Sequence, residues 1–502
     1  MAFRIHGKNF FKDNLYVLIP SLIWLVLTLR FTARANIYAD DAALISDFEN
    51  GSLGSHLTSF LNWVPGRNLT IFFQFLFFRV SSTNIDSFGF YHGIAQLFYV
   101  CTAITIGVLI LKLTKNKFLA LIATTLFLFN PLHIEITNWA LALPQHIIST
   151  LSSLITIYFL FQPSRTRNTI FIYFGILIMV FTYDQSAALA LFLIIFILLP
   201  FNNKLLIISF RRSRLFICFS ALLTICFFCI SYFGRIALGH GSNLSENSLE
   251  LLYKNLFSRP MHLFTKFTSY YLEELPIAVM LSFSVVLLIA ISVLVFQRHK
   301  ISYRLKNIDF SSIKVSVFFL FSSFFSFLPA ALWYPAIRHL YLPGALLMIS
   351  VFIFLDALNF LKTWRRKFIQ NLVLVLGLLL FAFLQTNSLI HWQNRDAVRK
   401  NFYLELSEKS REFPSHTNFI IDISSPELEK LFYAELMTSA YQYYNDFSNF
   451  ERVKIHQFSR TDSLKICLAT QVEQLLFVEI TLDKANYNAF EYSVVPVERF
   501  CN

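Results

Sequence analysis

The chain has 502 residues, of which 56% are hydrophobic and only 14% are charged, and it carries a formal net charge of +12. Soluble globular proteins have about 25% charged residues, so this composition excludes an ordinary soluble enzyme. The positive charge matches the excess of Lys and Arg in the cytoplasmic loops of membrane proteins, and we expect no nucleic-acid partner. The predicted fold class is an all-α polytopic membrane protein in a lipid bilayer.

Eleven apolar segments are the predicted membrane helices, because crossing the ~30 Å hydrocarbon core takes roughly 17–25 apolar residues. With the N-terminus inside, every short loop rich in Lys and Arg falls on the cytoplasmic side, as the positive-inside rule requires. An odd number of spans then places the C-terminal residues outside. The predicted segments cover residues 14–31, 86–111, 118–131, 144–161, 169–183, 185–200, 215–233, 276–296, 313–331, 340–360 and 368–389.

The chain divides into two predicted domains, a transmembrane domain over residues 1–389 and a small α/β domain over residues 390–502 on the non-cytoplasmic side. The second domain is polar and contains the strand-like runs NFIIDI and LLFVEITL and the helical run SPELEKLFYAELMTSAYQYY. It also holds Cys467 and Cys501. An oxidising compartment would permit a disulfide between them, and two free thiols are the alternative.

Two adjacent acids, Asp40 and Asp41, follow the first apolar segment in the stretch YADDAALISDFENGSLGSHL. Adjacent side chains point in different directions on a helix or a strand, so we do not expect the two carboxylates to share a proton. A carboxylate that faces a partly dry cavity is a candidate general base for a hydroxyl acceptor. The alternative is a pair of ordinary solvated loop residues.

His133 and Glu135 lie in the stretch NPLHIEITNWALALPQHI, between Pro131 and Pro144. An extended segment would put both side chains on one face, where they would bind and orient a substrate. Together with the acids of the first loop they could also bind a divalent metal, so a metal cofactor is kept as an alternative. A third interpretation is a histidine at the membrane interface that is hydrogen-bonded to nearby backbone.

Asp184 stands between two short apolar runs in TYDQSAALA, either as a site residue or as the cap of the next helix. Arg338 and His339 precede Tyr341 in LPAALWYPAIRHLYLPGALL. Arginine suits bidentate recognition of phosphate. The alternative is an arginine that lies among aromatic residues at the membrane interface and extends its charged group into water. Arg67, in NWVPGRNLTIFF, is a second candidate for phosphate binding.

In this order, these stretches resemble the motifs of the GT-C superfamily of membrane glycosyltransferases, in particular the protein O-mannosyltransferases with tetratricopeptide repeats and their bacterial relatives. Asp40 and Asp41 match the aspartate pair of that group's first outer loop. GRNLTIFFQFLFFR matches its Arg-Pro-Leu-like stretch, and FNPLHIEITNW matches its His-Pro-x-His-x-Glu motif. Tyr183 and Asp184 match its Lys-Glu turn, and IRHLYLPG matches its Glu-Arg-x-Leu-Tyr-Leu-Pro motif. The likeness spans roughly residues 36–350.

The chain departs from the pattern of that group at several positions. Asn130 replaces the first His of the third motif, Ile337 replaces the Glu before Arg338, and no Pro follows Arg67. The C-terminal repeats of the group are missing, and a short tail takes their place. The resemblance therefore implies the fold and the reaction class, but it does not identify the sugar or the acceptor.

The resemblance implies an inverting transfer of a sugar from a polyprenyl-phosphate donor to a hydroxyl of a protein, a lipid or a cell-surface glycan. Asp40, with Asp41, would take the acceptor's proton, and Arg338 with Arg67 would stabilise the departing lipid phosphate. The implied substrate-binding set is completed by His133, Glu135, Asp184, His339 and Tyr341. The implied location is a bacterial cytoplasmic membrane. The alternatives are a transporter or flippase, or an assembly protein, for lipid-linked glycans.

Overall fold

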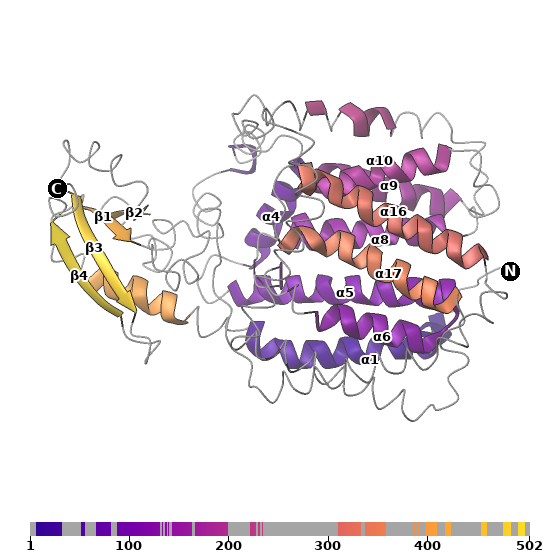
Figure 1. The fold of residues 1–502 in the computed structure, drawn as a ribbon, viewed down its shortest axis with the longest axis horizontal. Helices are drawn as coiled ribbons and strands as arrows, with labels where there is room; N and C mark the ends of the chain where they lie inside the picture. The colour runs from indigo at the N-terminus through magenta and orange to yellow at the C-terminus, as the bar shows by residue number, and fades with distance from the viewer. Residues whose placement is uncertain are drawn as a thin grey trace, which may run out of the picture.

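The structure is a computed structural model, which describes a bundle of helices and a β-sheet (Figure 1). Cys467, Cys501, the predicted span 276–296 and most of the spans 215–233 and 368–389 lie outside the described residues. The described residues are 7–32, 52–55, 67–81, 88–130, 133, 136–137, 139, 143–162, 166–198, 221–226, 229–230, 233, 310–332, 337–357, 383, 386, 390, 397–408, 417–422, 453–458, 475–482 and 490–496.

The bundle is built mostly from helices that follow one another along the chain and run in alternating directions (Figure 1). Its elements are α1 (Gly7–Thr32), α4 (Asn68–Ser81), α5 (Phe88–Thr114), α6 (Lys117–Leu128), the π-helix η3 (Leu143–Ile148), α8 (Ser149–Leu160), α9 (Thr166–Thr182), α10 (Asp184–Leu198), α16 (Phe310–Leu332), the 3₁₀ turn η9 (Ile337–Leu340) and α17 (Tyr341–Ala357). The apolar runs predicted from residues 14, 86, 118, 144, 169, 185, 313 and 340 onward coincide with α1, α5, α6, α8, α9, α10, α16 and α17.

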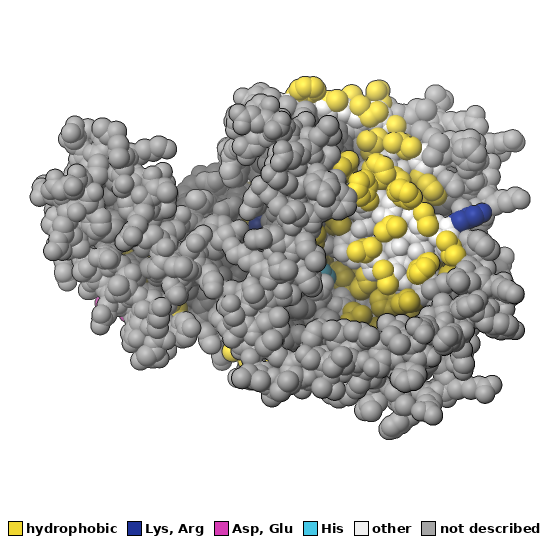
Figure 2. Space-filling view, in the orientation of Figure 1, with side chains coloured by type: hydrophobic (Ala, Val, Ile, Leu, Met, Phe, Trp, Pro, Cys, Tyr) yellow, Lys and Arg dark blue, Asp and Glu magenta, His cyan; other side chains and the backbone are white. Residues whose placement is uncertain are grey.

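Four helices in the described part of the chain are long and apolar enough to cross a membrane, which indicates a membrane protein. Large apolar side chains also cover the surface of the bundle: Leu22 and Val26 on α1 are each 64% exposed, and Figure 2 shows hydrophobic side chains gathered over α16 and α17. An apolar surface of this kind suits lipid rather than water. The total of eleven spans and their orientation stay predictions. The four helices are Tyr91–Thr114, Leu143–Leu160, Ser311–Ala331 and Arg338–Ala357.

Trp24 of α1 lies at the centre of the packing between the first helices. Its ring centroid lies 5.2 Å from that of Phe129, edge to face, and 5.6 Å from that of Tyr99 on α5. A buried indole N–H needs a hydrogen-bond acceptor, and Trp24 Nε1 donates to Gln96 Oε1 at 3.2 Å. Gln96 Nε2 in turn donates to the carbonyl of Thr137 at 3.2 Å. These bonds tie α1 to α5, and α5 to the segment that precedes η3.

Gly107 of α5 lies at a close contact between α1, α5 and α6. A Cβ atom at this position would lie 2.8 Å from Cγ2 of Val17 on α1 and would also clash with Oγ1 of Thr124 on α6. Small residues let helices in membranes pack with their backbones close together. The missing side chain of Gly107 therefore sets the spacing of these three helices.

The described strands form one sheet in the order β2-β1-β3-β4. The central strand β1 (Thr417–Asp422) is parallel to β2 (Val453–Phe458) and to β3 (Leu475–Leu482), whereas β4 (Phe490–Pro496) is antiparallel to β3. Strand β1 covers most of the run NFIIDI, and β3 covers the run LLFVEITL. A separate α/β domain over residues 390–502 stays a prediction, because the expected helical run of this region lies outside the described residues.

We expect Gly107→Ala to lower the thermal stability of the protein in detergent or nanodiscs. The added methyl group would overpack the contact with Val17 and Thr124, and overpacking typically costs about 1–3 kcal/mol. Gly93→Ala is the matched control on the same helix, because a Cβ there would meet nothing within 4 Å. Since alanine is the better helix former, the control should be neutral or slightly stabilising. Equal melting temperatures for the two variants would contradict the close packing at Gly107.

Candidate functional site

The structure describes six of the nine predicted site residues. Asp40, Asp41 and Glu135 lie outside the described residues, so their predicted roles stay predictions. The other six fall into two groups, one around the turn between α9 and α10 and one in the packed interior next to α5. The first group contains Arg67, Asp184, Arg338 and His339, and the second contains His133 and Tyr341.

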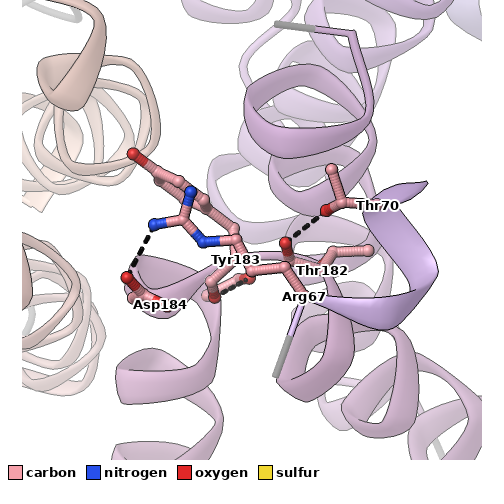
Figure 3. Close-up of polar contacts among 6 residues, drawn as sticks. Arg67, Thr70, Thr182, Tyr183 and Asp184 are labelled. Carbon is pink, nitrogen blue, oxygen red and sulfur yellow. Dashed lines mark hydrogen bonds and ion pairs between the residues drawn. The ribbon is translucent and has the colours of Figure 1, made fainter. Parts of the chain in front are cut away.

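An ion pair between Arg67 and Asp184 forms the centre of the first group (Figure 3). Arg67 precedes α4, and Asp184 is the first residue of α10, separated from the end of α9 by Tyr183 alone. Arg67 Nη2 lies 2.8 Å from Asp184 Oδ2. The hydroxyl of Thr70, one turn into α4, donates a hydrogen bond to the carbonyl of Thr182 at the end of α9. The two contacts fix the start of α4 on the turn between α9 and α10.

The guanidinium of Arg67 also lies over the ring of Tyr183, with Cζ 4.6 Å from the ring centroid. Burial by itself lowers the pKa of Arg67, but the charge and hydrogen bond of Asp184 outweigh this effect, so the pKa is raised from its ordinary value. Arg67 is therefore a permanent cation, which Asp184 and the face of Tyr183 hold in place. The side chains of Arg67 and Asp184 are 14% and 13% exposed.

Arg338 and His339 reach the same place from the turn η9. The carbonyl of His339 accepts a hydrogen bond from Gln185 Nε2 at 2.8 Å, which ties η9 to the first turn of α10. The guanidinium of Arg338 lies over the ring of Trp139, with Cζ 5.0 Å from its centroid. The positive charge of Arg338 acts on Arg67 and opposes its protonation. Two arginines from distant parts of the chain therefore lie close enough to repel each other.

His146 completes this group, and sequence reasoning missed it. It belongs to the π-helix η3, and its ring centroid lies 4.6 Å from that of Tyr183 and 6.0 Å from that of His339. The side chain is buried, with 2% relative exposure. The stretch that contains His133 and Glu135 also includes His146, next to its last residue. Pro144 was the available signal. Proline is common at the first position of a helix, so the sequence could have placed His146, two residues later, at a helix N-terminus.

These side chains form an electropositive cluster that we call the arginine cluster, defined by Arg67, Arg338, His146, His339 and Asp184. It holds two arginines, and a single carboxylate among the described residues offsets one of them. Partly buried arginines attract anions strongly, since little water competes for them. The arrangement suits a ligand with a phosphate or carboxylate group.

His133 belongs to the second group, where the chain itself satisfies its ring nitrogens. Its Nδ1 lies 3.1 Å from the carbonyl of Phe127 and 2.9 Å from the hydroxyl of Tyr99, and its Nε2 lies 3.1 Å from the amide of Asn130. A neutral ring with the proton on Nδ1 fits these partners, with Asn130 donating to Nε2. Burial lowers the pKa of His133 to about 3. This geometry favours the interpretation of a histidine held by nearby backbone.

Tyr341 packs in the same interior group rather than beside Arg67. Its ring centroid lies 4.7 Å from that of His133 and 6.1 Å from that of Tyr99. The side chain is 1% exposed, so its substrate-binding role stays a prediction. Within the described residues, no three His, Cys, Asp or Glu side chains come together to hold a metal ion. The metal alternative combined His133 with acids of the two loops, and those acids, Asp40, Asp41 and Glu135, lie outside that part of the chain.

We expect Asp184→Asn to lower the free energy of unfolding by about 3 kcal/mol, because it leaves a partly buried arginine without its counter-ion. Asparagine caps a helix as well as aspartate does, so a purely capping role would change stability by less than about 1 kcal/mol. Thermal unfolding of the purified protein measures the difference. Asp356→Asn is the control, because Asp356 accepts a hydrogen bond from the neutral amide of Asn116 at 3.3 Å. Equal effects of both variants would mean that the ion pair contributes nothing.

His133 makes stability depend on pH. Its pKa is about 3 in the folded protein, against an ordinary value of 6.5. Between these values the unfolded chain binds a proton that the folded chain does not, so stability is full above pH 6.5 and falls as the pH drops. The slope is about 1.4 kcal/mol per pH unit. Melting curves at pH 7, 6 and 5 should show a smaller slope for His133→Gln than for the wild type. Parallel slopes would contradict a buried neutral histidine.

No protein-family model matches the chain, and no curated protein sequence matches it.

Proposed function

We propose that the chain is an integral membrane glycosyltransferase that moves a sugar from a polyprenyl-phosphate donor to an acceptor hydroxyl. One observation supports this more than any other: Arg67 and Arg338, from segments far apart in the chain, come together in the arginine cluster beside apolar helices. A lipid phosphate has the complementary chemistry, an anion attached to a long hydrocarbon. The apolar surface of the bundle suits the isoprenoid chain, and the arginines suit the phosphate.

The proposed reaction is an inverting displacement. The acceptor oxygen attacks the anomeric carbon as the bond from that carbon to the phosphate oxygen breaks, and the phosphate leaves with the bonding electrons. Asp40 takes the proton of the acceptor hydroxyl, and Asp41 lies beside it in the sequence. Arg67 and Arg338 stabilise the negative charge that develops on the departing phosphate. The acceptor is a hydroxyl of a protein, a lipid or a cell-surface glycan.

The finer topology belongs to the same proposal. Eleven spans with the N-terminus inside would put the arginine cluster at the non-cytoplasmic side of a bacterial cytoplasmic membrane, together with Asp40 and an α/β domain over residues 390–502. Donor, acceptor and base would then meet at one face of the membrane. The turn between α9 and α10, the turn η9 and the π-helix η3 already share one end of the bundle, because their side chains contact one another.

The test is transfer itself, measured with purified protein in nanodiscs and a panel of polyprenyl-phosphate sugars. We expect release of polyprenyl phosphate together with a glycosylated acceptor. Arg338→Ala should raise the KM for the donor more than the KM for the acceptor. Arg338→Lys should restore only part of the donor affinity, because lysine cannot make two parallel hydrogen bonds to a phosphate. Asp40→Asn should lower kcat by about 10²–10⁴-fold, the scale of a lost general base.

Lys314→Ala is the control, because Lys314 is an exposed cation on α16 that is not part of the arginine cluster. It should leave both kinetic constants unchanged. Movement of the donor between leaflets without its consumption would favour the flippase alternative. No transfer from any donor, or wild-type turnover in Asp40→Asn, would overturn the proposed mechanism.

A further inference from the structure

Two buried nitrogen atoms in the arginine cluster make no hydrogen bond within the described part of the chain. They are Nε2 of His146 and Nε of Arg67, and both side chains contact the ring of Tyr183. Leaving a buried polar atom without a partner destabilises a fold, so each such atom calls for an explanation, of which a functional role is one. Arg67 already has a role in the proposed function, whereas His146 has none.

The backbone around His146 is also unusual. His146 lies in the π-helix Leu143–Ile148, which continues directly into α8. π-Helical turns are rare and are found frequently at functional sites, because the wider turn moves a side chain away from the direction that a regular α-helix would give it. Here the π-helix places the imidazole against Tyr183 and His339, which come from two other parts of the chain.

The charges around His146 indicate what kind of group its Nε2 would meet. Arg67, Arg338 and His339 all lie near enough to interact with the ring electrostatically. A neutral imidazole has one N–H donor and one acceptor nitrogen. An anion drawn in by the arginines can only accept hydrogen bonds, so the proton must be on the nitrogen that faces it.

We propose that His146 is a third binding residue of the arginine cluster, in which Nε2–H donates a hydrogen bond to the same anionic oxygen group that Arg67 and Arg338 attract. The proposal rests on the proposed function in one respect, since it takes a lipid-linked phosphate as the ligand. It adds a neutral donor of fixed direction to the two cations. The arginines then supply attraction, and His146 supplies orientation of the phosphate.

Binding of farnesyl phosphate and of farnesol to the full chain in nanodiscs tests this proposal, because the two probes differ only in the phosphate. We expect the wild type to prefer farnesyl phosphate. His146→Phe keeps a ring against Tyr183 but removes the donor, and it should reduce this preference about tenfold, the scale of one hydrogen bond to a charged group. His146→Gln, whose amide nitrogen can replace Nε2–H, should keep most of the preference.

Thr150→Val is the matched control. Thr150 lies one turn further along on α8, is fully buried and has a hydroxyl with no partner among the described residues. Its hydroxyl makes no hydrogen bond to the arginine cluster, so the variant should keep the wild-type preference. An unchanged preference in His146→Phe, or an equal loss in Thr150→Val, would overturn the role of His146 and leave the transfer reaction standing. A wild type that binds both probes equally would overturn the phosphate site as a whole.

Discussion

Arg67 and Asp184 are 117 residues apart in the sequence, and their ion pair acts with the hydrogen bond from Thr70 to the carbonyl of Thr182 to join distant segments. The pair fixes the start of α4 on the turn between α9 and α10, and it holds the guanidinium over Tyr183. Tyr183 in turn contacts His146 of η3, and Gln185 holds η9. Because each contact depends on the position of that turn, the whole arginine cluster depends on one partly buried pair of charges.

The membrane environment explains why a partly buried ion pair differs from most polar contacts of the bundle. Polar groups in lipid must find partners inside the protein, and most hydroxyls of the bundle do so locally. Thr28 and Thr124 each donate to the carbonyl four residues earlier in their own helix. Ser316 of α16 and Ser350 of α17 instead donate to each other's carbonyls, at 2.9 and 2.8 Å. The unsatisfied nitrogens of the arginine cluster depart from this pattern, as does the hydroxyl of Thr150.

Apolar periodicity and charge were sufficient to predict most of the helices, because burial in lipid leaves few other solutions for long apolar runs. The predicted run at 144–161 coincides closely with the continuous helix Leu143–Leu160. The same reasoning could not find the π-helix within it, since the extra residue per turn leaves no pattern in the sequence. Strands β2 and β4 were also not predicted. Strand β2 has the sequence VKIHQF, which lacks a long apolar run.

Residue chemistry was enough to pick out the arginines that the structure brings together, whereas the surroundings of each histidine depend on packing. Arginines near the ends of apolar helices need an anionic partner, and the structure brings Arg67 and Arg338 together. A histidine gives no such signal, because the sequence does not show whether its nitrogens already have partners. His133 has partners for both nitrogens, while His146, less prominent in the sequence, leaves Nε2 without one. Only the fold distinguishes the two.

The turn that carries Asp184 has a further consequence for the depth of the arginine cluster. The described parts of α9 and α10 have 17 and 15 residues and are joined by Tyr183 alone, so they are about 23–26 Å long. The hydrocarbon core of a typical bilayer is about 30 Å thick, and in the proposed topology a hairpin of this length would cause hydrophobic mismatch. The bilayer would thin around it, or its turn would lie below the level of the headgroups. Under the proposed function, a lipid phosphate at the arginine cluster would then lie deeper than its neighbours in the same leaflet, where the membrane itself would exclude water from the leaving group.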